Sequence, residues 1–564
     1  MAHEVRKSQL ALSLGLFAAV GLLSIVPLVY MLVYSFDVAD LGLSFKFGFD
    51  GWVDAFTNTR TLSSIGNTLL LSLRAPLALF VSVAVAFMIV RVRFPGRRFV
   101  EMFIWFGFLL PTVPMLMGWM LLLDGNSGLL NRWGMDLGVT DTPIFALKSY
   151  AGIIWIHITA TTIPFLVILL SPAYRQFDAS IEEAGFVAGA SSMTVLRRIT
   201  LPLLATAFAT AFIATLIKSL ETFEVEQIIG TPVGINVYSN RIYDLMRFDP
   251  PRISEAMALS TVFMVVLIVL VALFRLNARF RSGLDTLSGR NHAVQVKDTR
   301  GRRIGAAIIA YLFVGVTIAM PLTALTVGTF TRLFGFFHLE DPWTLNNWQM
   351  VLGDPRFIKS ALSSITIGTG VAVCGLVLYI GIAWSMVRIN AGWQRIANVL
   401  VWLPWALPGL VLSNVLLVMF LNVPLLVGLY GSVIPMGLAL IIKEMPIAVQ
   451  IIRVALAQLN SHMTEAGFMS GASHVMVLRK IVLPLIRPSL IAAFLLVFAG
   501  AVRDISSIVL LAPPGTRTLS LLMFDFATSG ELEAASVVGL IVAIICLVVT
   551  GLAFSATHKS RLEQ

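Results

Sequence analysis

The sequence predicts an all-α, polytopic membrane protein of about twelve transmembrane helices, arranged as two parallel six-helix halves. Three observations support this prediction. Hydrophobic residues make up 58% of the 564-residue chain, charged residues only 12%, and the mean hydropathy is +0.89. Apolar runs recur at the length of a bilayer crossing, about 20 residues. One phrase also occurs twice, 282 residues apart, as in proteins built from two related halves.

The spans of the first half are apolar runs bounded by charged or polar loops. The first run, 9–36, follows Arg6 and Lys7 and resembles a signal peptide, but it is too long for a secretory leader and is expected to be retained. The second run ends at the basic loop 91–98, and the third lies between that loop and the acidic loop 124–148. The six expected spans are 9–36, 66–90, 101–123, 149–172, 203–223 and 256–274.

The second half repeats this order after a polar, basic segment. Proline and tryptophan landmarks recur in the same sequence, with Pro164 matched by Pro446 at the offset of 282 and Trp52 by Trp348 at 296. Loop lengths therefore differ between the halves while the order of features is kept. The six expected spans are 304–330, 361–387, 396–420, 430–452, 485–502 and 535–556. We expect a first half at 1–280, a basic linker at 281–303 and a second half at 304–564.

The basic residues indicate the orientation. With the N-terminus inside, 25 of the 40 Lys and Arg residues lie on the cytoplasmic side, as the positive-inside rule requires. Both termini are then cytoplasmic, and so are both copies of the repeated phrase. The net charge of +10 is explained by this topology, so a nucleic-acid partner is not expected.

The repeated phrase reads EEAGFVAGAS at 182–191 and TEAGFMSGAS at 464–473, followed by LRRITLP and LRKIVLP. It predicts a short helix, a tight turn at Gly189 or Gly471, and a second helix that Pro202 or Pro484 can begin. The small residues alone would fit helix packing. Two copies with the same spacing on the same side instead favour a docking surface for a cytoplasmic partner.

This pattern resembles the EAA motif of the permease subunits of ABC importers, Glu-Ala-Ala, three residues, Gly, nine residues, Ile-x-Leu-Pro. The resemblance covers essentially the whole chain and implies the type I importer permease fold. Glycine stands at the third position of each copy, where the family usually has alanine. The resemblance implies that the loops near 181–202 and 463–484 dock a cytoplasmic ABC ATPase, with one of two ATPase copies at each loop. The matching residues are Glu183, Ala184, Gly185, Gly189, Glu465, Ala466, Gly467 and Gly471.

The chain carries no sign of chemistry of its own. It lacks the Gly-x-x-x-x-Gly-Lys-Ser/Thr phrase that cradles nucleotide phosphates, so ATP is expected to be hydrolysed by the partner subunit. The seven histidines are scattered and the two cysteines lie in apolar runs, so we expect no catalytic residues, no bound cofactor and no metal site. The chain is interpreted as a transport subunit of the inner membrane and not as an enzyme.

The fused two-half form resembles the ferric-iron permease group. Its second half also carries the run from Arg503 and Asp504 to Leu511, which is similar to that group's Arg-Glu-Leu-Ser/Pro-x-x-x-Leu-Leu. Importers of thiamine, phosphonates and polyamines share the motif, so they remain alternatives. In all of them, the resemblance implies a separate extracytoplasmic binding protein that delivers the solute.

Ionisable residues at the outer ends of spans are candidates for the substrate path or its gate. They are Glu221, Glu224, Arg503 and Asp504, and Glu221 is equivalent to Arg503 at the offset of 282. Opposite charges at equivalent positions predict either a latch between the halves or contacts to a cationic cargo. A purely structural charge network is the competing interpretation. Lys443 and Glu444 are a further charged pair, for which a structural ion pair is the favoured reading.

A different class also has two parallel six-helix halves, the major-facilitator secondary transporters. The basic loop 91–98 resembles the loop of that group, but the Gly and Asp that usually precede its arginines are absent. The repeated phrase also has no role in that mechanism. The sequence therefore favours the ATP-driven importer.

Overall fold

The structure is a computed structural model that describes residues 2–39, 45–176, 180–281, 300–337, 339–513 and 515–562. Within these ranges the chain forms helices and loops, with two isolated β-bridges, Asp37–Phe47 and Thr331–Trp343. The core of the predicted linker, residues 282–299, lies outside the described residues.

Residues up to 281 form the first set of helices, with single π-helical or 3₁₀ turns labelled η. They are α1 (Ala2–Tyr34), α2 (Asp50–Thr57), α3 (Thr59–Ser72), α4 (Arg74–Arg91), α5 (Arg97–Leu109), α6 (Thr112–Leu123), α7 (Leu129–Asp136), α8 (Tyr150–His157), η1 (Ile158–Thr162), α9 (Ile163–Gln176), α10 (Ser180–Val187), α11 (Ser192–Val195), η2 (Leu196–Thr200), α12 (Leu201–Leu203), α13 (Ala205–Leu220), η3 (Glu226–Gly230), η4 (Thr231–Val233), α14 (Tyr238–Arg247) and α15 (Ile253–Arg281).

Residues from 300 onward repeat the arrangement. Their helices are α16 (Arg300–Val314), η6 (Gly315–Ala319), α17 (Met320–Gly328), α18 (Asn346–Gly353), α19 (Pro355–Arg388), α20 (Ala391–Trp402), η7 (Leu403–Ala406), α21 (Gly409–Asn422), α22 (Pro424–Val427), α23 (Ile434–Ala457), α24 (Ser461–Met469), α25 (His474–Val477), η8 (Leu478–Val482), α26 (Leu483–Leu485), α27 (Arg487–Arg503), α28 (Leu519–Thr528) and α29 (Leu532–Leu562).

The predicted all-α membrane fold is confirmed. Within the described ranges, seven helices are long and apolar enough to cross a membrane, and three bent pairs pass the same test together. These ten account for all the expected spans except 396–420 and 430–452. The first of these is divided among α20, η7 and α21, and the second is α23, which carries Lys443 and Glu444 near its middle.

Two expected single helices are broken by proline. The expected span 101–123 bends by 103° between α5 and α6. Leu110 is extended there and is followed by Pro111, because the residue before a proline is driven out of the helical region. The expected span 396–420 breaks between α20 and α21, where Pro404 and Pro408 lie. Both breaks leave helix ends inside the bundle.

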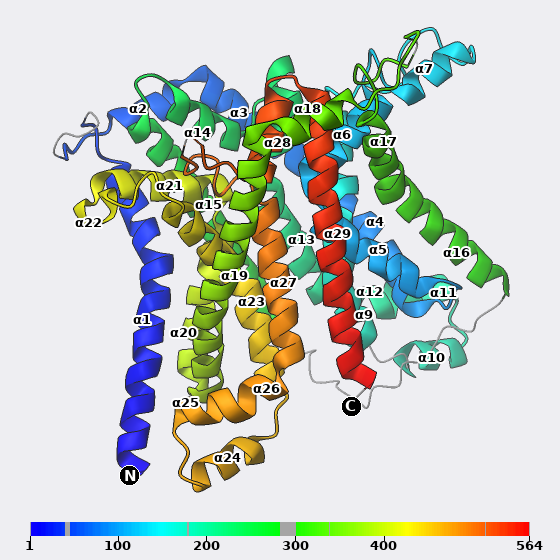
Figure 1. The fold of residues 1–564 in the computed structure, drawn as a ribbon. Coiled ribbons are helices and arrows are strands. Elements are labelled where there is room, and N and C mark those ends of the chain that lie inside the picture. The colour runs from blue at the N-terminus through cyan, green and yellow to red at the C-terminus, as the bar shows by residue number, and fades with distance from the viewer. Residues whose placement is uncertain are drawn as a thin grey trace.

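The two halves are interlocked. The first helix, α1, packs against α19, α20 and α21 of the second half, and α16 and α17 pack against α4, α5 and α6 of the first. Figure 1 shows α1 (blue) beside α20 and α16 (green) beside α5. The Ser24 hydroxyl donates to the Leu400 carbonyl at 2.9 Å, and a Cβ on Gly118 would lie 1.9 Å from the Pro321 carbonyl oxygen. The boundary between the halves in sequence is therefore not a boundary in space.

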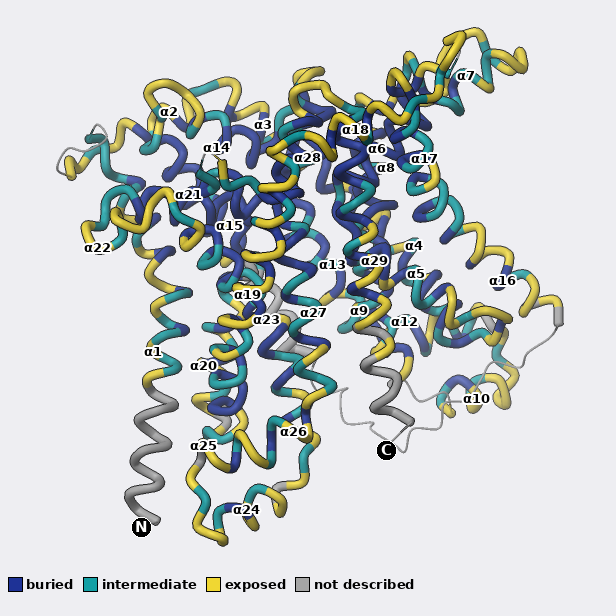
Figure 2. Tube along the Cα trace, in the orientation of Figure 1, coloured by how far each residue is buried: buried dark blue, intermediate teal, exposed yellow. Residues whose placement is uncertain are grey.

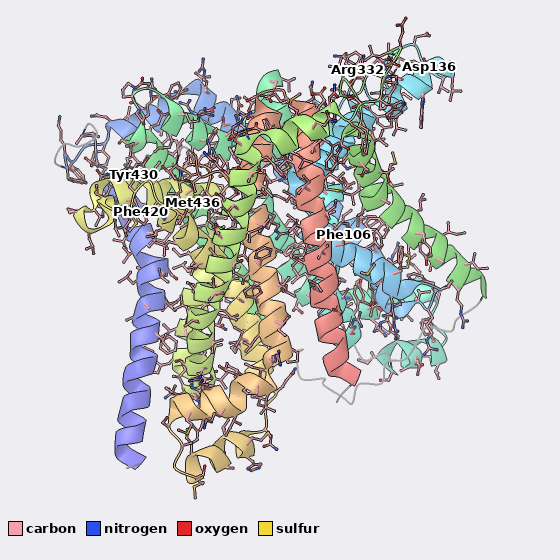
Figure 3. All side chains as sticks on the ribbon, viewed as in Figure 1. Phe106, Asp136, Arg332, Phe420, Tyr430 and Met436 are labelled. Atoms are coloured by element: carbon pink, nitrogen blue, oxygen red, sulfur yellow. The ribbon has the colours of Figure 1, made fainter. Side chains whose placement is uncertain are left out.

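Burial follows the pattern of a membrane bundle. Helices at the centre are buried, while outward-facing positions expose large apolar side chains such as Leu22, Phe80, Leu362 and Val548 (Figure 2). Figure 3 places the labelled Asp136 and Arg332 at one tip of the molecule and Phe106 within the body. An apolar surface around a buried core is what a lipid environment requires.

Candidate functional site

The two repeated loops, residues 181–202 and 463–484, lie at one end of the molecule. Figure 1 shows α10 and α24 at the same end as both marked ends of the chain, as two halves of parallel orientation predict. Glu183 and Ala184 are exposed on α10, and Glu465 and Ala466 are exposed on α24. The motif carboxylates are thus available to another protein.

Each loop turns in the same way. Gly189 and Gly471 have φ of +83° and +78°, the left-handed conformation that favours glycine. The N–H of Ala190 donates to the carbonyl of Gly185 at 3.0 Å, and the N–H of Ala472 donates to that of Gly467 at 3.2 Å. This is the hydrogen-bond pattern of a glycine-terminated helix, as the sequence predicted. The space where a Cβ would stand on Gly189 or Gly471 is open.

The third-position glycines have a packing reason. A Cβ on Gly185 would lie 2.8 Å from the Cδ1 atom of Ile199, and a Cβ on Gly467 would lie 2.7 Å from that of Ile481. These isoleucines begin the Ile-x-Leu-Pro part of each copy. The two ends of the motif therefore pack on each other, and the departure from alanine coincides with this close approach.

A feature that the motif reading missed lies at the tip of each loop. Val187 and Met469 are equivalent at the offset of 282, and their exposed fractions are 89% and 88%. Each precedes its left-handed glycine by two residues. The repeated loops thus present a carboxylate and an exposed apolar side chain in the same arrangement. Apolar periodicity predicts buried positions, so it gave no signal for these two residues.

The loops differ in how they are anchored. In the first, the Thr200 hydroxyl donates to the buried carboxylate of Glu182. The equivalent residues of the second loop are Thr464 and Val482, so this contact has no counterpart there. Instead, the Arg388 guanidinium at the end of α19 stacks over Trp384 at 3.5 Å and over Phe468 of α24 at 5.2 Å.

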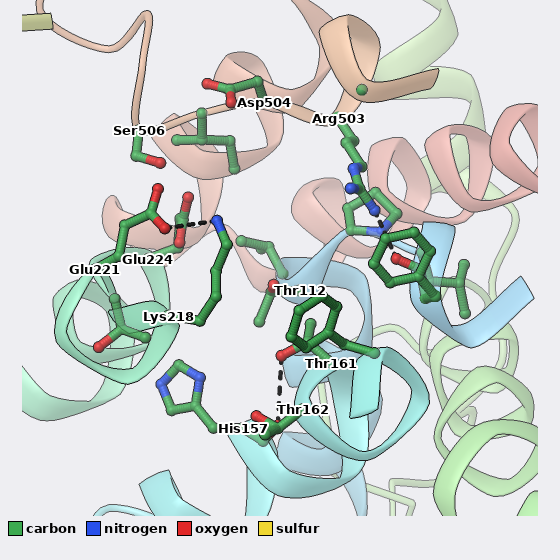
Figure 4. A pocket seen from close by; sticks show the side chains of 18 of the residues that line it. Thr112, His157, Thr161, Thr162, Lys218, Glu221, Glu224, Arg503, Asp504 and Ser506 are labelled. Atoms are coloured by element: carbon green, nitrogen blue, oxygen red, sulfur yellow. Dashed lines mark hydrogen bonds and ion pairs between the residues drawn. The ribbon is translucent and has the colours of Figure 1, made fainter. Parts of the chain in front are cut away.

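The candidate path residues meet in one cavity of about 270 Å³ between the halves (Figure 4). Its walls come from α4, α5, α6, α8, η1, α9 and α13 of the first half and from α23 and α27 of the second. All four residues expected from the sequence, Glu221, Glu224, Arg503 and Asp504, line it.

The cavity is lined by equivalent positions of the two halves. Fourteen of its lining residues form seven pairs separated by 282 positions. In several pairs a charged residue of one half corresponds to a small or neutral residue of the other, so the two sets are equivalent in position but not in charge. The pairs are Thr161/Lys443, Thr162/Glu444, Phe165/Ile447, Lys218/Gly500, Glu221/Arg503, Thr222/Asp504 and Glu224/Ser506.

Lysines make the ion pairs of this cavity. The Lys218 ammonium lies 2.6 Å from Glu221 (Figure 4). The Lys443 ammonium lies 2.8 Å from Asp504 in its own half and 3.9 Å from Glu221 in the other. The pairing that the sequence suggested between Glu221 and Arg503 is not formed. Lys443 therefore forms an interhelical ion pair, as the structural reading of Lys443 and Glu444 expects, and it also lies within ion-pair distance of the other half.

The Glu444 carboxylate packs against Gly500. A Cβ on Gly500 would lie 2.3 Å from a carboxylate oxygen of Glu444, so any larger residue at position 500 would displace that carboxylate. The equivalent position in the first half is Lys218. Glycine at position 500, where the first half has Lys218, thus leaves room for the Glu444 carboxylate. Glu444 lines the cavity together with Glu221, Glu224 and Asp504.

A buried ionic group in the first half was missed by the sequence reading. Arg74 and His157 both face the Glu226 carboxylate, at 3.8 Å and 2.9 Å, and the Thr222 hydroxyl donates to it at 2.8 Å. Arg74 is 1% exposed and Glu226 is fully buried. At the offset of 282, alanine is the counterpart of His157 and isoleucine that of Glu226. These residues are far apart in sequence and lie in apolar surroundings, so neither spacing nor repetition could reveal the group.

Among the described residues, no group of three or more His, Cys, Asp or Glu side chains has a geometry suited to a metal ion. The Lys443 ammonium lies near both the Asp504 and the Glu221 carboxylates, at 2.8 Å and 3.9 Å.

Comparison with known proteins gives one family and several distant relatives. The family described as binding-protein-dependent transport system inner membrane component matches residues 77–281 and 375–559. A probable ABC transporter permease protein, y4fN of Sinorhizobium fredii, is 26% identical over 69% of this chain and 68% of its own length. The ferric transport system permease protein FbpB of Actinobacillus pleuropneumoniae is 24% identical over 72% of this chain, which spans 58% of that relative.

One relative matches from end to end. The Fe(3+)-transport system permease protein FbpB 2 of Haemophilus influenzae is 22% identical over 92% of this chain and 93% of its own length. The spermidine/putrescine transport system permease protein PotC of Escherichia coli is 24% identical over 48% of this chain and 96% of its own. The family matches both halves, once each.

Proposed function

This chain belongs to the family of binding-protein-dependent transport system inner membrane components, the permease subunits of ABC importers, and within this family we propose that it imports ferric iron. The family excludes the major-facilitator alternative. Support for iron is the end-to-end similarity to a fused ferric permease. Polyamines, thiamine and phosphonates are the competing cargoes.

The observation that carries the transport role is the cavity at the junction of the halves, lined by equivalent pairs. A passage between two parallel repeats runs along the axis that relates them. Movement of one half against the other then opens the cavity to one side of the membrane at a time. Closing Glu221, Asp504 and Lys443 onto each other would seal the outer side.

The energy enters at the repeated loops. We place the loops 181–202 and 463–484 in the cytoplasm, each in contact with one ATPase subunit. That subunit binds and hydrolyses ATP, and its motion reaches the bundle through α10 and α24. A binding protein outside the membrane delivers the cargo, which the description of the family as binding-protein-dependent transport supports.

The test is reconstitution of the full chain with its partner ATPase and binding protein. Vesicles are assayed for ATP-dependent uptake of labelled Fe³⁺, spermidine, thiamine and a phosphonate. Uptake of Fe³⁺ at least about tenfold above a Gly189→Trp/Gly471→Trp control supports the proposal; tenfold corresponds to about 1.4 kcal/mol of coupling.

Two outcomes contradict the proposal in different ways. Uptake of another cargo with no Fe³⁺ transport would correct the substrate and leave the importer. No ATP-dependent uptake of any cargo, with a monodisperse complex, would reject the transport function.

A further inference from the structure

Glu221 and Arg503 occupy equivalent positions at the outer ends of α13 and α27, but each reaches across to the opposite half. One carboxylate oxygen of Glu221 accepts a hydrogen bond from the backbone N–H of Gly409 at 3.3 Å. The Arg503 guanidinium donates to the backbone carbonyl of Phe108 at 2.6 Å and lies over the Phe108 ring. The two contacts are thus reciprocal between the halves.

Both contacts end on a broken span. Gly409 is the first residue of α21, and Phe108 lies in the last turn of α5. The first N–H groups and the last carbonyls of a helix have no partner within it. The helix dipole makes its N-terminus positive and its C-terminus negative. The carboxylate therefore meets a positive helix end, and the guanidinium meets a negative one.

Close packing fixes the position of Glu221. A Cβ on Gly409 would lie 2.6 Å from the Ser507 hydroxyl and 2.9 Å from the Lys443 ammonium. The same ammonium lies between Glu221 and Asp504. Glu221 thus joins the first half to α21 and α23 of the second, with no room for a side chain between them.

We propose that Glu221 and Arg503 form a reciprocal clasp that holds the outer side of the cavity closed, each binding backbone groups at a helix end of the opposite half that have no partner within their own helix, and not each other. Lys443 reinforces the Glu221 side. The inference rests on the proposed function, because the clasp controls access to the proposed path. Since each charge matches the helix end it meets, exchanging the two charges breaks both contacts.

The experiment reports closure without cargo or ATP. In the full chain, Cys374 is replaced by Ser and Cys546 by Ala, and Ser506→Cys is introduced as a reporter, because Ser506 lines the cavity and is 8% exposed. Spheroplasts are treated with a membrane-impermeant maleimide. The variants compared are Glu221→Arg, Arg503→Glu and the double exchange.

The clasp predicts that each single variant labels about tenfold faster than the parent, because charge reversal removes the hydrogen bond to the helix end and places the unfavourable sign of charge there. It also predicts that the double exchange labels at least as fast as either single variant. Return of the double exchange to the parental rate would show direct pairing and overturn the proposal. Unchanged labelling in all three would also overturn it.

Matched variants guard against misfolding and general charge effects. Arg517 and Asp525 form a direct pair at 3.1 Å within the second half, partly exposed. Exchanging their charges should leave Ser506→Cys labelling unchanged. If a charge reversal does not give monodisperse protein, Glu221→Gln and Arg503→Lys decide.

These conservative variants keep an acceptor for Gly409 and a donor for Phe108. They should label no more than about threefold faster, whereas Glu221→Ala and Arg503→Ala should reach the higher rate. Equal rates for the conservative and alanine variants would overturn the clasp. An intact labelling pattern in a chain that transports nothing would instead reject the proposed function and leave the clasp standing.

Discussion

At the scale of single residues, the motif glutamates combine exposure with different neighbours. Glu183 is exposed beside the buried Glu182, whereas Glu465 is 62% exposed with the His462 ring 3.6 Å away. Removing either carboxylate should leave a donor on the ATPase unpaired and cost on the order of 1–3 kcal/mol of coupling. We expect Glu183→Ala and Glu465→Ala each to lower cargo-stimulated ATP hydrolysis, by unequal amounts.

The assay uses vesicles that contain the complete transporter. His462→Ala serves as the control, because it removes the neighbour of Glu465 and keeps the carboxylate. Full stimulation in both single variants and in the double variant would remove the glutamates from the docking surface.

The third-position glycines allow a finer prediction. The atom nearest to a Cβ on Gly467 is the end of the flexible Ile481 side chain, which can turn away. Gly467→Ala should therefore cost less than about 1 kcal/mol, whereas Gly467→Leu should cost about 1–3 kcal/mol by overpacking. Thermal unfolding of the two variants measures the difference. Equal stability would show that the loop is loosely packed.

At this scale the sequence predicted a large part of the site. The repeated phrase identified the turn at Gly189 and Gly471, because a repeated spacing is visible in a single chain. The exchange of partners in the cavity was not predictable. Glu221 and Arg503 were read as a pair since they are equivalent, but which groups they contact depends on where Pro111 and Pro408 break the neighbouring spans.

At the scale of elements, substitutions at the two left-handed turns can distinguish the effect of backbone strain from the effect of side-chain size. A residue other than glycine at Gly189 or Gly471 costs roughly 1–2 kcal/mol in this conformation, and asparagine tolerates it best. Because the surrounding space is open, a tryptophan there would not clash with the turn but would project from the loop onto the proposed docking surface.

We therefore expect Gly189→Trp/Gly471→Trp to lose ATPase co-purification and uptake, while Gly189→Asn/Gly471→Asn retains most of both. Co-purification from detergent extracts and uptake in vesicles measure the two effects. Wild-type values in the tryptophan double variant would contradict docking at these turns, and equal losses in both variants would assign the effect to strain.

At the scale of the whole molecule, the first helices of each half, α1 and α16–α17, pack against the opposite half. This packing determines whether the two halves unfold together. Hydropathy predicted two halves in sequence, but it carries no information on which half a span packs against. The contact between α6 and α17 is so close that a Cβ on Gly118 meets the Pro321 backbone. Such interlocking predicts one cooperative unit and not two independent ones.

We expect Gly118→Ala to destabilise both halves together by about 1–3 kcal/mol, because backbone at Pro321 cannot turn aside as a side chain can. Thiol reactivity on heating reports each half: the buried Cys546 for the second and an introduced Ala86→Cys, at a fully buried position of α4, for the first. Cys374, which is exposed, is replaced by Ser. The control is Gly437→Ala, where the added Cβ would make an ordinary contact at 3.9 Å. Both thiols should become reactive at one temperature in the parent and at one lower temperature in Gly118→Ala. If only one thiol becomes reactive at the lower temperature in Gly118→Ala, the two halves unfold separately. Opening of the cavity would then be a movement between two halves that do not stabilise each other.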